Sequence, residues 1–234
     1  MDPRHRDQIA FIRVCSGRFV RDMKAFHART GGLVRLSSSH KIFARERETV
    51  HEAYPGDVIG LVGHPEFLIG DTLTEDRGIV YDAIPRFAPE HFAYLRCDQT
   101  IQTKRFRAGL DHLVQEGVVQ SFRLPASTAP VLAAVGPLQF EVLQYRLESE
   151  YGAETRLESA PWSLVRWVEP STVVPEGDLP TGCRVAEDDA GRTAILFSEA
   201  WACDLFVKRH PEVHLASQPI EGESPARTPG AARG

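Results

Sequence analysis

The chain has 234 residues, 42% of them apolar, and a formal net charge of −5. This length is enough for two modest domains, and the apolar share is typical of a globular protein with a real core. The negative charge argues against a protein that coats nucleic acid through bulk charge. No run approaches the roughly twenty apolar residues of a spanning helix, and the charged start is unlike a signal peptide. We therefore expect a cytoplasmic protein with no membrane partner.

The first third of the chain is rich in short β segments separated by turn residues. Strands are expected at residues 9–14, 24–28, 33–36, 42–44, 49–53 and 58–62. Turns such as Thr30-Gly31-Gly32 and Pro55-Gly56-Asp57 separate them. Many short, evenly spaced strands predict a small β-barrel, ending near residue 84 where two prolines flank an extended segment.

The middle third alternates strands with helices. Strands are expected at residues 92–97, 118–123, 131–135, 153–158 and 163–168. One helix is expected from Thr100 to a stop at Gly117, and another from Pro137 to Gly152. The side chains expected to face the core are Phe106, Leu110, Leu113 and Val114 in the first helix and Leu138, Val142, Leu143 and Leu147 in the second. The order β-α-β-β-α-β predicts a ferredoxin-like α+β domain.

The last third is less regular. Residues 170–189 are acidic and turn-rich, and a strand at 194–197 and a helix reaching Arg209 follow as a C-terminal β-α extension. Ser198 would cap that helix, with Trp201, Leu205 and Phe206 facing inward. Residues 217–234 have almost no apolar content and are predicted to be disordered. The expected domains are thus 1–84 and 85–216, followed by the tail 217–234.

Nucleotide chemistry has no support in the residues. A phosphate-binding P-loop needs a glycine directly before its lysine, and none of the lysines follows a glycine. Two segments fit the loose Asp-x-x-Gly pattern of a GTPase switch, one starting at Asp57 and one at Asp188. Without a P-loop upstream, we interpret both as chance matches.

Metal, thiol and nucleophile chemistry are also unsupported. His210 and His214 have the spacing of zinc ligands on a helix, but Pro211 breaks the helix that would align them. No serine elbow and no cysteine–histidine pairing stands out. The cysteines lack Cys-x-x-Cys spacing and are expected to be buried, reduced thiols; they are Cys15, Cys97, Cys183 and Cys203. No catalytic, cofactor-binding or metal-binding residue is predicted.

Several segments, in a fixed order, resemble one family. Asp57-Val58-Ile59-Gly60 and Gly70-Asp71-Thr72 resemble the second, barrel domain of translational GTPases. The segments that narrow the choice are Ile84-Pro85-Arg86-Phe87-Ala88-Pro89, Glu116-Gly117-Val118-Val119, Gly136-Pro137-Leu138-Gln139-Phe140-Glu141 and Arg166-Trp167-Val168-Glu169. Together they resemble peptide chain release factor 3, from the start of the chain to Glu169 and only weakly beyond it.

The resemblance implies the ribosome-docking portion of a translation factor. In that family the whole protein is a GTPase that promotes departure of the codon-reading release factors after peptide release. Its first domain binds GTP with magnesium, and its second and third domains dock on ribosomal RNA and proteins. The resemblance also implies that the stretch from Met1 to Asp7 is internal, so that the GTPase domain and the first barrel strand are absent here. We therefore expect no cofactor in this chain.

Arginines suit bidentate contacts with phosphate, so the basic side chains of both domains are candidates for docking on ribosomal RNA or protein. The candidates are Arg29, Arg35 and Arg45 in the barrel, and Lys104, Arg105 and Arg107 on the first helix of the following domain. The alternative reading is an ordinary solvated face.

Two other classes of protein stay open. One is a fragment of a related translational GTPase, of the elongation factor G or ribosomal-protection type. It would require a histidine where this chain has Gln139, and further domains after the third. The other is a stand-alone module that binds RNA or protein.

Overall fold

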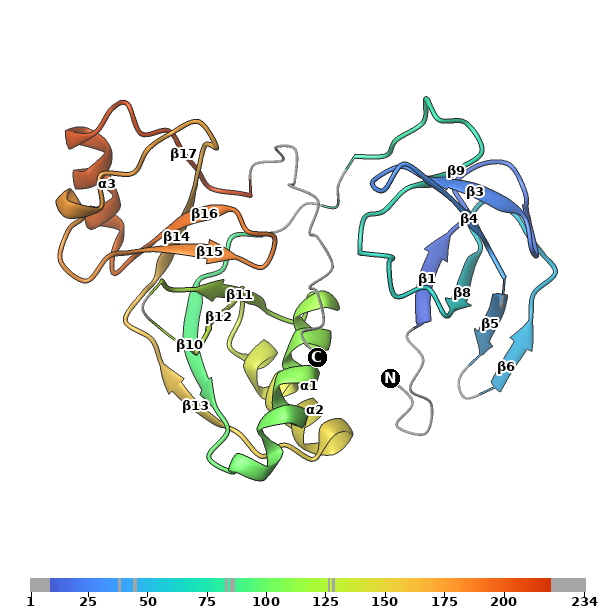
Figure 1. The fold of residues 1–234 in the computed structure, drawn as a ribbon, viewed down its shortest axis with the longest axis horizontal. Helices are drawn as coiled ribbons and strands as arrows, with labels where there is room; N and C mark the ends of the chain where they lie inside the picture. Colours follow the sequence, from blue (N-terminus) through green and yellow to red (C-terminus); the bar gives the residue numbers. More distant parts are fainter. Residues whose placement is uncertain are drawn as a thin grey trace, which may run out of the picture. The chain divides into compact units, whose positions relative to one another are not determined.

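The computed structural model describes residues 9–37, 39–43, 46–82, 84, 87–125, 127 and 129–219. The chain divides into two compact units, residues 1–85 and residues 86–234 (Figure 1). Each unit has a hydrophobic core of its own, so each is described by itself.

The first unit is built from short antiparallel strands. In chain order they are β1 (Ile9–Arg13), β2 (Phe19–Val20), β3 (Lys24–His27), β4 (Gly32–Arg35), β5 (Ser39–Phe43), β6 (Glu46–Thr49), β7 (Glu52–Ala53), β8 (Val58–Val62) and β9 (Leu73–Thr74). They form a sheet of order β1-β8-β5-β6, a sheet of order β4-β3-β9 and the pair β2-β7. This is the barrel-like arrangement that the spacing of the short segments predicts.

One small core holds these strands together. Its buried members are Val14, Phe19, Ala25, Leu36, Ala53, Ile59 and Leu61. Along β3, Ala25 and His27 are buried whereas Lys24 is exposed, which is the alternation of a strand with one face on the core. The predicted strand at 49–53 is two strands, β6 and β7, and the two-residue strands β2 and β9 are not predicted by the sequence.

The second unit begins with the predicted β-α-β-β-α-β order. Its elements are β10 (His91–Arg96), α1 (Thr103–Gln115) after a 3-10 turn, β11 (Gln120–Arg123), β12 (Val131–Ala134), α2 (Leu138–Tyr151) and β13 (Arg156–Ser159). The strands lie in the order β13-β10-β12-β11, and all of these neighbours are antiparallel. This order confirms the ferredoxin-like arrangement.

The same sheet continues without a break into the C-terminal extension. Its further elements are β14 (Leu164–Val168), the 3-10 turn η2 (Glu176–Asp178), β15 (Arg184–Asp188), β16 (Thr193–Phe197), α3 (Ala200–Arg209) and β17 (Leu215–Ala216). β11 pairs with β15, so one eight-stranded sheet runs β13-β10-β12-β11-β15-β16-β14-β17. The segment 170–189, predicted to be acidic and turn-rich, therefore also contains a strand that the sequence did not predict, and β14 pairs within the extension.

Central strands of this sheet are buried on both faces. On β10, Ala93 and Leu95 pack with the helices α1 and α2, whereas Phe92 faces a second core. On β16, Leu196 faces that second core, and Ile195 packs in a third core that includes residues of α3. The single sheet therefore has α1 and α2 packed at one end and α3 at the other, and the second core combines residues from both of its halves (Figure 1).

Both long helices end at left-handed glycines. Gly117 lies just after the C-cap of α1 with φ of 75°, and Gly152 is the C-cap of α2 with φ of 62°. These are conformations that glycine adopts without the penalty of a Cβ atom. The two helix stops predicted from the sequence are thus confirmed.

Some predicted orientations are wrong. Leu138 and Val142 do not face the core, because they are 68% and 49% exposed on the outer side of α2. Trp201 on α3 is 57% exposed.

The predicted helix cap and the predicted burial of the cysteines are also partly wrong. The residue before α3 is Glu199, and no side chain caps that helix, so Ser198 is not its cap. Cys15 is exposed and Cys97 half-buried, whereas Cys183 and Cys203 are buried; all four are free thiols.

The two Asp-x-x-Gly patterns have structural roles. The segment starting at Asp57 runs into β8. The segment starting at Asp188 is the turn between β15 and β16. The buried Asp188 carboxylate accepts hydrogen bonds from the Trp167 indole at 3.0 Å, the Arg192 guanidinium at 2.7 Å and the Ala190 amide at 2.9 Å. A buried carboxylate needs such partners, and here they fix the hairpin.

The close packing of α1 on α2 depends on Gly109. A Cβ atom at this position would lie 2.7 Å from the Tyr151 ring and 2.8 Å from Leu147. We expect Gly109→Ala to lower the free energy of unfolding by about 1–3 kcal/mol despite the better helix propensity of alanine. Gly136→Ala is the matched control, since its Cβ would meet open space. Denaturant unfolding of both variants checks this, and an unchanged or stabilised Gly109→Ala would contradict it.

Candidate functional site

Arg29, one of the predicted docking cations, is held in an ion pair within the first unit. Its Nε and Nη2 lie 2.6 and 2.9 Å from the two carboxylate oxygens of Asp71, and Nη2 also donates to the Glu66 carbonyl at 2.7 Å. A guanidinium fork against a carboxylate is among the strongest geometries for an ion pair. Arg29 therefore ties the loop before β9 to the end of β3, a role that the sequence analysis did not identify.

The same carboxylate also holds the buried His27. The Nε2 of His27 lies 2.8 Å from Oδ2 of Asp71 and must donate, because an ionised carboxylate only accepts. The Thr30 hydroxyl lies 3.0 Å from the other ring nitrogen, and the Leu68 amide donates to Asp71 at 2.8 Å. We call His27, Arg29 and Asp71 the Asp71 clasp.

The residues on either side of Asp71 complete the connection. Gly70 has φ of 93°, a conformation that favours glycine. The Thr72 carbonyl accepts a hydrogen bond from the Ala28 amide at 3.0 Å. The Thr72 hydroxyl accepts one from the Tyr81 amide at 3.1 Å. The Gly70-Asp71-Thr72 motif thus joins β3, β9 and the segment that follows β9.

The clasp shifts the pKa of its carboxyl group. Burial alone would raise the pKa of Asp71, but the hydrogen bonds from Arg29, the Leu68 amide and His27 and the charge of Arg29 hold it below its ordinary value. The hydrogen bond to Asp71 raises the pKa of Arg29 in turn. Both shifts favour the charged pair.

A basic face lies at the other end of the same hairpin. Lys24 on β3 stands directly opposite Arg35 on β4, and both side chains are exposed. Like charges opposite each other on a sheet destabilise it. Asp22 offsets part of this cost, with its carboxylate 3.3 Å from Nε of Arg35.

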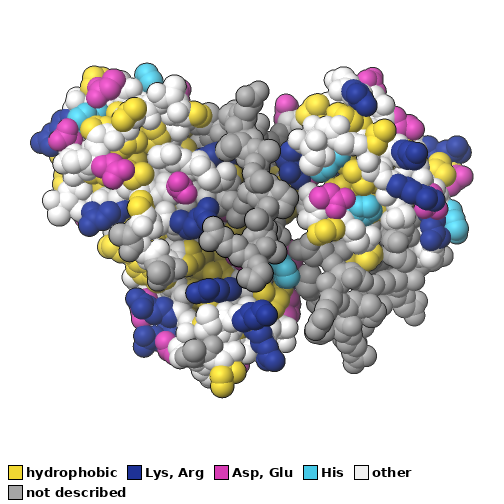
Figure 2. All heavy atoms as spheres, in the orientation of Figure 1, with side chains coloured by type: hydrophobic (Ala, Val, Ile, Leu, Met, Phe, Trp, Pro, Cys, Tyr) yellow, Lys and Arg dark blue, Asp and Glu magenta, His cyan; other side chains and the backbone are white. Residues whose placement is uncertain are grey.

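The next register position of this face is apolar. Leu33, opposite Phe26, is 67% exposed, and the Arg77 guanidinium lies 4.9 Å from the centre of the Phe26 ring. We call Lys24, Phe26, Leu33, Arg35 and Arg77 the β3–β4 face. Figure 2 shows Lys and Arg side chains gathered on the side of the first unit that carries β3 and β4.

The candidates on α1 divide into two groups. Lys104 and Arg107 are exposed on the outer side of the helix, and within the described part of the chain neither forms an ion pair. Arg105 instead lies at the C-terminus of α2, where a Cβ atom on Gly152 would be 3.7 Å from its Nη1. A cation there is favoured by the helix dipole. Arg45, the remaining candidate, is outside the described residues.

Gln139 has a structural role at the start of α2. Its side-chain oxygen accepts from the amides of Val135 and Gly136 at 2.8 and 3.1 Å, and its Nε2 donates to the Val118 carbonyl at 2.9 Å. A carboxamide provides both an acceptor and donors for these three backbone groups. This is the position where the alternative translational GTPases would require histidine.

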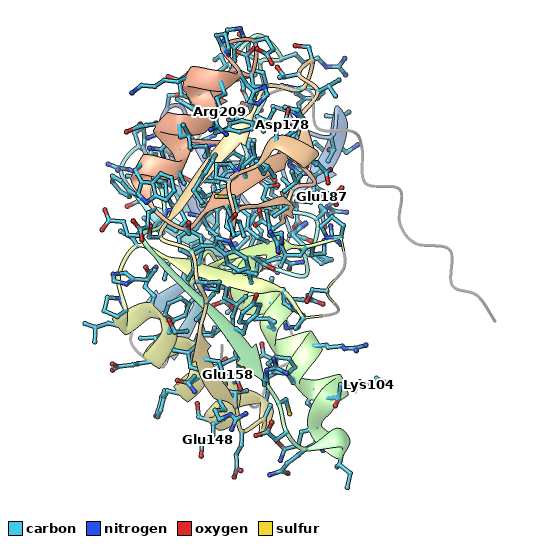
Figure 3. All side chains as sticks on the ribbon, turned by 90° about the vertical axis from the view of Figure 1, so that its left-hand side faces the viewer. Lys104, Glu148, Glu158, Asp178, Glu187 and Arg209 are labelled. Atoms are coloured by element: carbon cyan, nitrogen blue, oxygen red, sulfur yellow. The ribbon has the colours of Figure 1, made fainter. Side chains whose placement is uncertain are left out.

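The acidic, histidine and cysteine side chains of the described residues do not gather into a metal-binding group. Across residues 9–219, wherever the structure describes them, no group of three or more His, Cys, Asp or Glu side chains is placed to hold a metal ion. An open hollow of about 510 Å³ lies between η2 and the end of α3, beside Asp178 and Arg209 (Figure 3). His210 lines this hollow, and its Nδ1 lies 3.1 Å from a carboxylate oxygen of Glu212. No described helix is long and apolar enough to cross a membrane.

Comparison with known proteins assigns the family. The family model described as "Class II release factor RF3, C-terminal domain" matches residues 81–207, more than half of the chain. The chain belongs to the class II release factor RF3 family. The model described as "Elongation factor G domain 2" matches residues 1–76, which agrees with a barrel-like first unit.

Individual relatives agree with this assignment. A peptide chain release factor 3 of Trichodesmium erythraeum is 45% identical over 231 residues, covering 96% of this chain and 42% of the relative. The corresponding protein of Synechococcus elongatus is 49% identical, covering 93% of this chain and 40% of the relative. The chain thus spans about two fifths of the length of the curated release factors that it matches.

A solved structure supports the fold alone. A crystal structure of a Thermus thermophilus protein matches 71% of this chain with a TM-score of 0.56 and 19% identity, covering 27% of the solved chain. The family that the sequence motifs suggested is confirmed by the family model and the relatives, and the order of barrel-like and ferredoxin-like units by the two family models.

Within this family, the assignment of docking residues stays a prediction. The structure brings Arg35 beside Lys24, which the sequence analysis did not select, and places Arg29 at the opposite end of the hairpin. Only the strand register identifies Lys24 as a candidate, because the pairing of β3 with β4 is what places residue 24 opposite residue 35.

The Asp71 clasp predicts a pH-dependent stability. Because the folded pKa of Asp71 is depressed, its contribution is present above the unfolded value of about 3.9 and is lost as the pH falls through the folded value. We expect Asp71→Asn to lower the free energy of unfolding by about 1–3 kcal/mol at pH 7. The difference from the unsubstituted chain should shrink as the pH falls from about 3.9 towards the folded pKa of Asp71.

Urea unfolding of both proteins between pH 7 and pH 3 measures this difference. Glu75→Gln is the control, since Glu75 is exposed and has no ion pair among the described residues. A difference between Asp71→Asn and the unsubstituted chain that stays constant with pH would show that the carboxylate charge is not the stabilising element.

Proposed function

We propose that this chain is a ribosome-docking portion of a release factor 3 protein and that the β3–β4 face contacts ribosomal RNA. The observation that carries the proposal is the direct opposition of Lys24 and Arg35 on an exposed sheet face. Two cations in this register repel each other in the free protein, and an RNA phosphate between them removes that cost.

The composition of the face supports an RNA partner. Arg35 and Arg77 supply planar guanidinium groups, and Arg77 already lies over the ring of Phe26. Asp22 is a weak competitor for phosphate because the Arg35–Asp22 pair is exposed on both sides, and exposed pairs contribute only about 0–1 kcal/mol. Lys104 and Arg107 on α1 provide further cations without an ion pair in the described part of the chain.

We further propose that the whole protein, in the cytoplasm, promotes departure of the codon-reading release factors by a GTP-dependent cycle. The names of the relatives and the family match support this. GTP and magnesium do not fit the residues of this chain, because no lysine follows a glycine and the Asp57 and Asp188 patterns are a strand entry and a hairpin turn. A domain outside this sequence would bind the nucleotide.

Charge reversal of the β3–β4 face tests the docking surface. We expect Lys24→Glu with Arg35→Glu to weaken co-sedimentation with purified ribosomes at least tenfold, and to reduce the slope of log affinity against log salt by about 1–2. The matched control is Lys208→Glu with Arg209→Glu, which makes the same charge change on α3 of the second unit. Equal losses in both double variants would show that only the net charge matters.

The nucleotide part of the proposal makes a separate prediction. The purified chain should show no GTP binding in calorimetric titration with magnesium present, because the P-loop backbone and its lysine are missing from the sequence. Magnesium-dependent binding of GTP, removed by EDTA, would contradict it.

A further inference from the structure

The outer side of α2 carries an apolar stripe that no described residue covers. Leu138, Val142 and Tyr145 are 68%, 49% and 70% exposed and follow one another at spacings of four and three residues. Residues at these spacings lie above one another on one face of a helix. Val135, just before the helix, is also 43% exposed.

Two exposed carboxylates lie beside this stripe. Glu141 and Glu148 are exposed on the same outer side, and within the described residues neither forms an ion pair. Arg146, the only cation of α2, lies one turn after Val142, and its charge is taken up by ion pairs with Glu116 and Glu150. The stripe therefore combines apolar side chains with uncompensated negative charge.

The position of Glu148 adds an independent observation. It lies in the last turn of α2, where the carbonyl end of the helix dipole disfavours negative charge, and no basic residue occupies that turn. Figure 3 shows Glu148 and Lys104 on opposite sides of the helix layer. Arg105 of α1 lies near Gly152 at this helix end, but Glu148 forms no ion pair among the described residues. The exposed carboxylate of Glu148 is therefore available to a cationic partner.

We propose that the stripe of Leu138, Val142 and Tyr145, with Glu141 and Glu148, binds a basic protein segment that inserts an apolar side chain between flanking lysines or arginines. RNA does not fit, because the carboxylates repel phosphate. A second copy in a two-fold contact would face its own carboxylates and does not fit either. An exposed tyrosine between aliphatic side chains is typical of a protein-binding hot spot. This surface is separate from the β3–β4 face, and the proposed function enters only in the choice of probe.

Photo-crosslinking tests this occupant. A benzophenone amino acid replaces Val142, and the full chain is irradiated with an RNA-free mixture of purified ribosomal proteins. We expect a crosslink to one or a few basic proteins, with a yield at least fivefold lower in the Glu141→Lys, Glu148→Lys background. The matched background is Glu176→Lys with Glu187→Lys, which changes the charge equally on the C-terminal extension and should leave the yield unchanged. A probe at position 207 on α3, where Val207 is 41% exposed, is the control for non-specific capture.

Each other outcome overturns the proposal. A crosslink only to a second copy or to another part of the same chain would assign the stripe to self-association or internal packing. A crosslink yield equal to that of the probe at position 207 would show non-specific capture. A yield that does not change in the Glu141→Lys, Glu148→Lys background would show that the partner is not recognised by its positive charge. The melting temperatures of the lysine variants show whether they remain folded. Loss of ribosome binding on reversal of the β3–β4 face, with no crosslink from α2, would sustain the proposed function and reject this inference.

Discussion

The burial of central strands on both faces is the constraint on which the second unit depends. β10, β12 and β16 each place alternate side chains in two different cores, so substitutions in these strands disturb two layers at once. Such strands have no face left for a partner. Exposed surfaces for recognition are therefore confined to the outer sides of the helices, the connecting segments and the edge strands, which is why the exposed apolar side chains of α2 are informative.

The first unit is stabilised by a smaller hydrophobic core than the second unit. Its core is built mainly from one side of short strands, and several of its buried residues are alanine or valine. Small cores supply little stabilisation. The Asp71 clasp adds charge-assisted hydrogen bonds at the end of β3, away from the basic end of the hairpin. This separation leaves Lys24 and Arg35 exposed while the opposite end of the same hairpin is fixed.

Local patterns predicted most of the fold. Alternation and turn glycines gave the strands, and Gly117 and Gly152 gave the helix ends, because a left-handed stop is a property of a few neighbouring residues. β15 was not predicted because its strand residues lie in an acidic, turn-rich segment, and only its pairing with β11 and β16 stabilises it. Val142 was assigned to the core because its spacing suits either side of a helix with apolar residues on both faces.

The candidate sites were harder to predict than the fold, because a charged side chain has the same appearance in a sequence whether it is paired or free. Arg29 and Arg35 were equivalent candidates, yet one is bound by a nearly buried carboxylate and the other faces a lysine across two strands. Strand register and long-range pairing decide this difference, and neither is a local property. The net charge of −5 does not predict the charge of individual surfaces for the same reason. The chain has a basic face on β3 and β4 and an acidic, apolar face on α2. We therefore expect recognition in this chain to depend on which charges remain exposed after folding, not on their sum.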